Sequence, residues 1–320
     1  MILQKFAEKG FFGSLKAILL ILGRLKNHAV APINRLDNYR RLKRLDYTIE
    51  FVNEGSIKVR LPEVSAIEII LGIGVSVNRN TNYQNRPFAE VLLRKTIYEL
   101  YESGYISRNL SVIDIGSWIS DNSIVWSHYL SDTAKVIAID PSSDNITYGQ
   151  NLANVNNIEN IKFVQAVCAD KSGIKLDFDG TIDHASFRVS TTQNYILSNT
   201  IDEIVAEEGL SIGLFHVDVE GFELSVLKGA VSVITRDLPV ISFEQHISKE
   251  NINDISSYLK DFNYRIFMVN EVLPGCDLDC RNFLAFPPKK GLPELTSFNQ
   301  QNGRDLGIYS AVIGDPLIEI

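Results

Sequence analysis

Two carboxylates and a glycine stand at the end of one apolar run of the sequence. The run from Ile212 to Val219 is typical of a buried strand, and Asp218, Glu220 and Gly221 lie at its end. Carboxylates gathered next to a hydroxyl group can take its proton, orient it or hold a divalent cation. For Glu220 and Glu223 a simpler explanation exists, because acids at a helix start stabilise it by about 0.3–1 kcal/mol each. That explanation does not extend to Asp218, which lies within the predicted strand.

A second acid and glycine end another predicted strand, Ser111–Ile115, and its turn. A dinucleotide-binding pattern would need glycines at 116, 118 and 121, whereas the sequence has Gly116, Trp118 and Asp121, which disfavours pyrophosphate binding. The carboxylate of Asp114 can instead pair with the cationic head of an amino acid, and Gly116 allows the backbone to approach it closely. An ordinary loop Asp with a turn glycine is the alternative interpretation.

Asp140 ends the next predicted strand, Lys135–Ile139, and lies 24 residues after Gly116. An acid about 20 residues beyond such a turn binds ribose hydroxyls in doubly wound folds, because a carboxylate accepts from both of them. The run Asp140-Pro141-Ser142 is also typical of a helix N-cap. The two roles are compatible.

The segment from His216 to Ala230, HVDVEGFELSVLKGA, is called the signature segment below. Together with Asp114-Ile115-Gly116 and Asp140 it resembles the FkbM family of S-adenosylmethionine-dependent methyltransferases. In that family a strand ending I-D-V-E-G is followed by E-x-x-V-L-K-G-A. The likeness extends over about Ser111 to Pro287 and includes QAVCADKSG, from Gln165 to Gly173.

The resemblance implies roles for ten residues. Asp114, Gly116 and Ser117 would line the methionine end of the cofactor, Asp140 would bind the ribose, and Gln165, Ala166 and Val167 would border the adenine. The predicted catalytic residues are Asp218, beside the sulfonium and the acceptor, then Glu220 and, at the end of the following strand, His246. For His246 and its neighbour Glu244 a helix cap or an ordinary hydrogen-bonded group is an equal alternative. The sequence does not decide whether a metal takes part.

The first turn departs from the family pattern D-x-G-A-N-x-G. Ser117, Trp118 and Ser120 stand where Ala, Asn and Gly are expected, and His216 stands where Lys is common. The side chain of a serine at 120 affects how closely the following helix packs on the cofactor loop. It therefore also affects the affinity for the cofactor.

Strand and helix patterns alternate after residue 110, which predicts a parallel sheet built from βαβ units. The predicted fold is α/β, a doubly wound, mostly parallel seven-stranded sheet of the class I methyltransferase, Rossmann-like type, with an N-terminal helical and hairpin extension. The predicted strands are Ser111–Ile115, Lys135–Ile139, Ile161–Ala166, Ile212–Val219, Pro239–Glu244, Tyr264–Val269 and Asn282–Phe286. The predicted helices are Asn122–Leu130, Ser142–Asn154, Ile201–Glu207, Phe222–Ile234 and Ile252–Phe262, after an earlier helical segment, Arg86–Ser103, and a hairpin within Tyr47–Leu61.

The polar segment from Asp170 to Asn199 is expected to be irregular. Its length of about 30 residues is typical of functional or mobile loops. His184 and Arg188 within it could contact substrate, although exposed loops commonly contain such residues.

The charge is divided unevenly along the chain of 320 residues. Up to Asp46 there are ten Lys and Arg against three acids, whereas the remainder has 21 against 36, and the total is −8. Nucleic acid is not an expected partner of so acidic a body, because its phosphates must be neutralised by clustered cations. The basic arm is the part suited to anionic surfaces.

The apolar run Phe11–Gly23 in this arm is too short for a bilayer-spanning helix, which needs about 20 residues. A cleaved signal is disfavoured because Arg24, Lys26 and His28 precede Ala29-Val30-Ala31. The arm is expected to lie on an anionic membrane surface or to pack on its own domain or a partner. Three cysteines form no disulfide scaffold, which favours a reducing, cytoplasmic location with or without membrane contact.

Four regions are predicted: a basic helical arm over 1–46, a hairpin and helical extension over 47–110, the methyltransferase domain over 111–290 and a tail over 291–320. The predicted activity is transfer of a methyl group from S-adenosylmethionine to a hydroxyl, in a sugar of a glycan or glycolipid. The sequence lacks the D-P-P-Y type motif of amino-group methylases, which favours oxygen. A small natural product as acceptor, or a non-catalytic module in protein assembly, are the alternatives. Oligomer formation is left open.

Overall fold

The computed structural model describes residues 49–53, 56–61, 64–72, 90–181, 184–189, 195–219, 221–246, 251–271, 280–288, 291–293 and 317–320. The arm predicted over 1–46 lies outside these ranges. Within them, no helix has the length and apolar character needed to cross a membrane.

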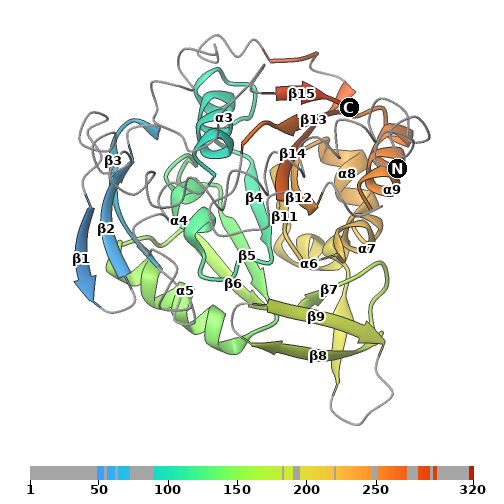
Figure 1. Ribbon diagram of the computed structural model, residues 1–320, viewed down its shortest axis with the longest axis horizontal. Coiled ribbons are helices and arrows are strands. Elements are labelled where there is room, and N and C mark those ends of the chain that lie inside the picture. Colours follow the sequence, from blue (N-terminus) through green and yellow to red (C-terminus); the bar gives the residue numbers. More distant parts are fainter. Residues whose placement is uncertain are drawn as a thin grey trace, which may run out of the picture.

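The main sheet has eight strands in the order β15-β13-β14-β12-β11-β4-β5-β6 (Figure 1). Neighbouring strands from β12 to β6 are parallel, β14 runs antiparallel to both β12 and β13, and β15 runs antiparallel to β13. The strand bounds are β4 Ser111–Ile115, β5 Val136–Asp140, β6 Ile161–Gln165, β11 Ile212–Val217, β12 Val240–His246, β13 Arg265–Val269, β14 Cys280–Phe286 and β15 Leu317–Glu319. Because the chain starts in the centre with β4 and later returns beside it with β11, the fold has a switch point between these two strands, where doubly wound folds bind ligands.

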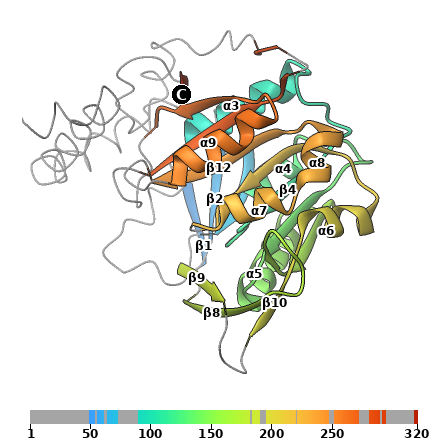
Figure 2. The same cartoon turned by 90° about the vertical axis from the view of Figure 1, so that its right-hand side faces the viewer.

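Helices cover both faces of this sheet (Figures 1 and 2). One face packs on α3 Val91–Glu102, α4 Asp121–Ser127 and α5 Ser143–Val155, and the other on α6 Ile201–Glu208, α7 Glu223–Lys228, α8 Val231–Asp237 and α9 Asn251–Asp261. Side chains alternate between two cores: Leu214 lies with Trp126 in the first, and Phe215 lies with Val226 in the second. The predicted doubly wound, mostly parallel α/β fold is confirmed.

Two predictions about the main sheet and its helices were wrong. The sheet has eight strands and not seven, because β15, only three residues long, adds to its edge from the predicted tail. The predicted helix Phe222–Ile234 is two helices, α7 and α8, separated at Gly229. A Cβ at Gly229 would lie 2.1 Å from the carbonyl oxygen of Ala169, so this close approach requires glycine.

The segment from Asp170 to Asn199, predicted to be irregular, contains three strands. They are β8 Lys175–Thr181, β9 His184–Val189 and β10 Ile196–Asn199, which form a small sheet with β7 Val167–Cys168 in the order β7-β10-β8-β9. The prediction was wrong because apolar residues alternate here with polar ones, as in a strand with one solvent-facing side. Such a strand has a polar composition similar to that of a loop.

The N-terminal extension is a three-stranded sheet followed by α3. The predicted hairpin is confirmed as β1 Ile49–Asn53 and β2 Ser56–Leu61, and β3 Ile67–Gly72, which was not predicted, pairs with β2. Buried residues of β2 and β3 belong to the same core as Val112 of β4. Asn156 joins the extension to α5, since its side chain bonds to Ile70 N at 2.7 Å and to Ile70 O at 2.8 Å. The four predicted region boundaries stay predictions.

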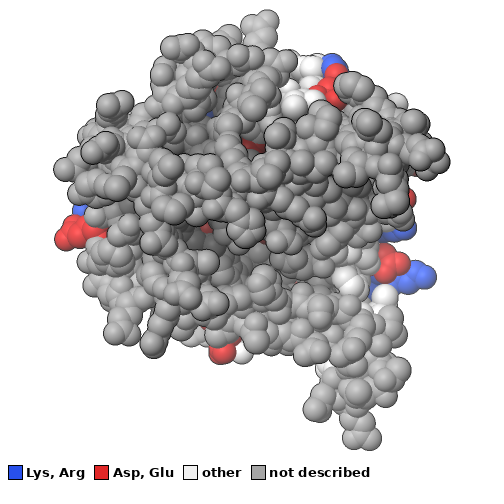
Figure 3. Space-filling model, viewed as in Figure 1, with Lys and Arg blue, Asp and Glu red and all other residues white. Residues whose placement is uncertain are grey.

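Ion pairs at the surface contribute little to this fold. At the edges of the view in Figure 3, acidic and basic side chains lie next to one another. Pairs such as Lys58–Glu68 and Arg265–Glu319 are about half exposed. Exposed pairs stabilise proteins by roughly 1 kcal/mol or less, so the two cores dominate.

Glu271 holds the start of α3 onto the main sheet. It follows β13, is 1% exposed and accepts hydrogen bonds from Leu92 N at 3.0 Å and Leu93 N at 3.3 Å. These are amides that a helix leaves unpaired at its N-terminus. Burial raises the pKa of Glu271 to about 8, although Arg94 and the two amides oppose the shift.

This raised pKa predicts a pH-dependent stability. Between the usual pKa of 4.5 and about 8, the folded protein keeps a proton that the unfolded chain releases, so stability falls as pH rises through this window. Glu271→Gln keeps an oxygen for the amides and has no charge to bury. Relative to the wild type, it should gain roughly 3 kcal/mol or more between these pH values in urea unfolding. The exposed Glu68→Gln is the control, and wild-type and Glu271→Gln curves that stay parallel across the window would refute the account.

Candidate active site

The carboxyl ends of β4 and β11 meet at the switch point. Gly116 N and Ser117 N donate to Ile139 O at 2.9 and 3.0 Å, and Asp218 N donates to Ile115 O at 2.9 Å. The loop after β4, residues 116–120, is called the donor loop, and the segment after β11, residues 218–221, is called the acidic loop. The donor loop is therefore hydrogen-bonded to the end of β5, and the acidic loop to Ile115, the residue directly before the donor loop.

Gly116 is the point of closest approach between these loops. Its φ is +76°, and a Cβ placed there would lie 1.7 Å from the carbonyl oxygen of Asp218. No side chain fits in that space, and the left-handed backbone also favours glycine. The predicted close approach at Gly116 is thus an approach to the acidic loop itself.

Asp140 is buried and already has three hydrogen bonds. Oδ2 accepts from Trp118 N at 3.0 Å, and Oδ1 accepts from Ser142 N at 2.9 Å and from Asn145 Nδ2 at 3.0 Å. The N-cap of α5 is Ser142, whose hydroxyl accepts from Asn145 N. Burial raises the pKa of Asp140 despite these bonds. Oδ2, with one donor, has room for one more, so it can accept from a ribose hydroxyl.

Asp114 is 1% exposed and accepts a hydrogen bond from the hydroxyl of Ser123 on α4. Burial raises the pKa of Asp114 to about 7, and the nearby acids Asp121, Glu90 and Asp140 add to the shift. With this pKa, the carboxyl group of Asp114 changes between its protonated and ionised forms near neutral pH. A cationic ligand beside it would favour its ionised form, as the predicted contact with an amino-acid head requires.

The serines of the donor loop are unusual in two ways. Ser117 Oγ and Ser120 Oγ are buried without a hydrogen-bond partner among the described residues. Ser120 also has φ +61°, a conformation that favours the glycine expected there from the family pattern. Two orphaned hydroxyl groups suit a carboxylate ligand, such as the methionine end of S-adenosylmethionine.

The packing of α5 on the donor loop depends on Gly149. A Cβ at Gly149 would lie 2.4 Å from Ser120 Oγ and 2.6 Å from Phe163 Cε1. The family has a glycine in the loop, whereas this chain has Ser120 there. Because Gly149 in α5 has no side chain, there is room for the side chain of Ser120. The donor loop accordingly keeps its close contact with α5.

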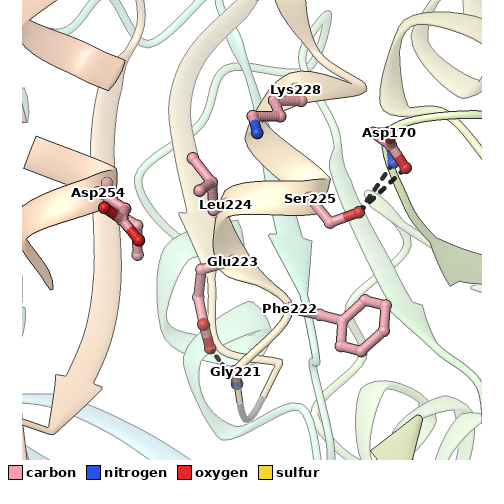
Figure 4. Close-up of a pocket in the computed structure, with 9 residues that line it drawn as sticks. Asp170, Gly221, Phe222, Glu223, Leu224, Ser225, Lys228 and Asp254 are labelled. Carbon is pink, nitrogen blue, oxygen red and sulfur yellow. Dashed lines mark hydrogen bonds between the residues drawn. The ribbon is translucent and has the colours of Figure 1, made fainter. Parts of the chain in front are cut away.

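Glu223 braces the acidic loop (Figure 4). Its Oε1 accepts from Gly221 N at 3.0 Å and from Val219 N at 3.3 Å, and the residue is 2% exposed. Burial raises the pKa of Glu223, while these amides and the Gln245 side chain lower it. Glu223 thus fixes the backbone that carries Asp218, beyond the simple helix-start role considered from the sequence.

The second half of the signature segment packs against the stretch from Gln165 to Gly173. Ser225 Oγ accepts from Asp170 N at 3.1 Å (Figure 4), and Gly229 lies against Ala169 as described above. A cavity of about 380 Å³ lies beside this contact, away from the donor loop. It is lined by Asp170, Gly221, Phe222, Glu223, Leu224, Ser225, Lys228, Asp254 and Ile255.

For the three residues predicted to border the adenine, the structure gives positions but no contact that tests this role. Gln165 is exposed at the end of β6, paired in register with Asp140, and its Nε2 donates to Pro141 O at 3.1 Å. Ala166 and Val167 follow it and are buried. Their predicted cofactor contacts stay predictions.

Glu220 lies outside the described residues, as do the side chains of His184, Arg188 and His246. The backbone places His184 and Arg188 in β9, and His246 at the end of β12 opposite Cys280. Cys168 and Cys280 are buried and form no disulfide within the described part of the chain. No group of three or more potential metal ligands occurs in the described part of the chain, so the structure describes no metal site there.

Three polar residues of this region were not among the predicted site residues. His216, Ser242 and Asn282 lie on β11, β12 and β14, and each has a buried polar atom without a partner among the described residues. Their signal in the sequence is a polar residue within a largely apolar strand. Such a signal is common, and only the strand order reveals that the three are neighbours.

One comparison with known proteins points to a family for the central region. Residues 114–266 match the family model of the Methyltransferase FkbM domain. No curated protein matches the chain significantly.

Solved structures of methyltransferases are among the structural matches. The methyltransferase FkbM from Methylobacillus flagellatus KT has 18% identity and a TM-score of 0.42, over 64% of this chain and 59% of that chain. An SAM-dependent methyltransferase from Aquifex aeolicus has 11% identity and a TM-score of 0.36, over 62% of this chain and 93% of that one. An rRNA methylase from Streptococcus thermophilus has 10% identity and a TM-score of 0.40, over 60% and 96%.

In the main sheet, β4 and β11 lie at the centre and β14 is reversed near one edge. Over residues 114–266 the chain is similar to the methyltransferase domain of the FkbM family, and this match supports S-adenosylmethionine as the cofactor.

Proposed function

We propose that the protein transfers the methyl group of S-adenosylmethionine to a hydroxyl oxygen of a sugar, in a glycan or glycolipid. The observation that carries this proposal is the contact of Gly116 with the carbonyl of Asp218. It joins the loop predicted to bind the methyl donor to the loop whose carboxylates are predicted to meet the acceptor. Holding two reactants in line supplies much of the acceleration of such a transfer.

Residues of the donor loop and its neighbours would hold the cofactor. Ser117 and Ser120 would donate their orphaned hydroxyls to the methionine carboxylate, and Asp114 would pair with the amino group. Asp140 would accept from a ribose hydroxyl through Oδ2. The segment from Gln165 to Val167 would border the adenine.

When bound, S-adenosylmethionine supplies an electrophilic methyl group on a sulfonium. Asp218, fixed by its backbone bond to Ile115 and by the brace of Glu223 on the acidic loop, would orient the acceptor hydroxyl. As the O–CH3 bond formed and the S–CH3 bond broke, with S-adenosylhomocysteine as the leaving group, the hydroxyl proton would pass to the Asp218 carboxylate and then to water. Glu220 and His246, at the ends of β11 and β12, are the other predicted catalytic groups.

A hydroxyl acceptor fits the chemistry of the described site. Its ionisable groups are mainly carboxyls, which bind and deprotonate hydroxyls, and the chain after Asp46 has 36 acids against 21 basic residues. That balance disfavours a polyanionic acceptor such as RNA. The choice of a sugar as the acceptor rests on the resemblance to the FkbM family. The basic arm over 1–46 would suit a glycan carried on an anionic membrane, with a small natural product as the alternative acceptor.

Two glycine variants test the junction of the loops through binding. Gly116→Ala should abolish calorimetric binding of S-adenosylhomocysteine, because its Cβ would collide with Asp218 O. Gly173→Ala is a matched control, since Gly173 has φ +77° but no atom within 4 Å of a Cβ. It should lose only about 1 kcal/mol of stability and keep its affinity. Equal affinity in folded Gly116→Ala and wild type would contradict this account of the site.

The activity itself is tested by transfer of tritium from methyl-labelled S-adenosylmethionine to a panel of aryl glycosides. Asp218→Asn should bind S-adenosylhomocysteine as the wild type does and lose about 100-fold or more in kcat. Asp144→Asn, an exposed acid of α5, is the control. Tight cofactor binding without transfer to any glycoside would reject the sugar acceptor. Absence of binding up to millimolar cofactor would favour the non-catalytic module.

A further inference from the structure

Three buried polar side chains lie on one face of the main sheet, on the neighbouring strands β11, β12 and β14. His216 and Ser242 are paired in register on the neighbouring strands β11 and β12, about 4.8 Å apart. Asn282 on β14 is paired with Glu244, two residues beyond Ser242. His216, Ser242 and Asn282 are called the acceptor floor below.

The floor lies beneath Asp218. Side chains alternate along a strand, and Leu214 and Val240 belong to the core shared with α4, so His216 and Ser242 face the same side. On β4 the register partner of His216 is Asp114. Asp218 comes two residues after His216, in the direction of the carboxyl edge. The floor therefore adjoins both the donor loop and the acidic loop.

Each member of the floor has a polar atom without a partner among the described residues. The atoms are His216 Nδ1, Ser242 Oγ and Asn282 Oδ1, on residues that are 3%, 0% and 1% exposed. A buried group left unpaired costs about 1–3 kcal/mol. Three such groups on adjoining strands, next to the reacting centre, are explained if a ligand pairs with them.

Neighbouring groups hold two of these side chains in place. Asn282 Nδ2 donates to Glu90 Oε1 at 2.8 Å, and Glu90 Oε2 accepts from Asn122 Nδ2 at 3.1 Å. The ring of His216 packs against Trp126 at 5.0 Å between centroids, with the planes at 69°. The floor is thus preorganised, since its side chains have fixed neighbours.

The chemistry of the floor selects an uncharged, hydroxyl-bearing ligand. Burial lowers the pKa of His216 to about 4, so the imidazole is neutral at neutral pH and offers no cation to an anionic ligand. Three acids lie around the floor on the same face of the sheet and would repel an anionic ligand: Glu90, Glu244 and Asp114. An imidazole nitrogen, a hydroxyl and an amide oxygen all bond well to hydroxyl groups.

We propose that the acceptor is an uncharged polyhydroxy compound and that it binds through His216 Nδ1, Ser242 Oγ and Asn282 Oδ1. This rests on the proposed function, since it names the acceptor of that same site. These groups position the acceptor next to Asp218 and set specificity, while the transfer step is the one described above.

Stability measurements test the floor without any acceptor. Ser242→Ala removes an unpaired hydroxyl, so its urea-unfolding midpoint should equal or exceed that of the wild type. Ser198→Ala is the matched control: Ser198 is 2% exposed, but its Oγ donates to Lys171 O at 2.6 Å and accepts from Ile174 N at 3.0 Å. That variant should unfold at lower urea. A drop in Ser242→Ala as large as in Ser198→Ala would overturn the proposal.

Kinetic measurements test the role in recognition. His216→Phe keeps a ring against Trp126 and deletes both nitrogens. It and Ser242→Ala should raise the KM for a neutral aryl glucoside at least tenfold and leave the affinity for S-adenosylhomocysteine unchanged. Ser256→Ala, which removes an unpaired buried hydroxyl on α9, should leave this KM unaltered. An unchanged KM in His216→Phe and Ser242→Ala would refute the proposal.

The charge of the acceptor is tested with a matched pair of substrates. The aryl glucoside should be methylated, whereas the corresponding glucuronide, which differs by one carboxylate, and an RNA oligonucleotide should not be. Preferred transfer to the glucuronide or RNA would overturn the uncharged acceptor. If no compound of the panel is methylated while the cofactor binds, the sugar acceptor fails, and the stability comparison of Ser242→Ala with Ser198→Ala still decides on the floor.

Discussion

The site depends on one backbone contact, the approach of Gly116 to the carbonyl of Asp218. It exists because β4 and β11 are parallel neighbours at the centre of the sheet, so that both chains leave their strands at the same edge. The hydrogen bond from Asp218 N to Ile115 O fixes the distance, and the missing side chain at Gly116 allows it. The donor loop then lies on Asp140 and α5 on one side and on the acidic loop on the other.

Most of the signature segment supports this contact without taking part in chemistry. Glu223 holds the amides of the acidic loop, and Gly229 lets α7 and α8 pack beneath the Ala169 carbonyl. Within the segment, His216, Asp218 and Glu220 are the residues proposed to meet a substrate. The likeness in sequence is thus largely a likeness in scaffold, which explains how it can specify the family while leaving the acceptor open.

The sequence predicted the central elements well and the contacts between distant residues poorly. The bounds of β4 matched the prediction because its run is mostly apolar, is buried throughout and is followed by a turn glycine. The strands β8 to β10 were missed because alternating polar residues resemble a loop. The accommodation of Ser120 depends on Gly149, 29 residues away, and the acceptor floor on a strand order that joins residues 216, 242 and 282. No local pattern carries that information.

The most direct test of the junction between donor loop and acidic loop is a crystal structure of the full chain with S-adenosylhomocysteine. The account predicts the homocysteine carboxylate at Ser117 and Ser120, the ribose at Asp140, and the sulfur beside the contact of Gly116 with Asp218, on the side of His216. S-adenosylhomocysteine bound instead in the cavity between α7 and α9, or with its sulfur away from Asp218, would contradict the account.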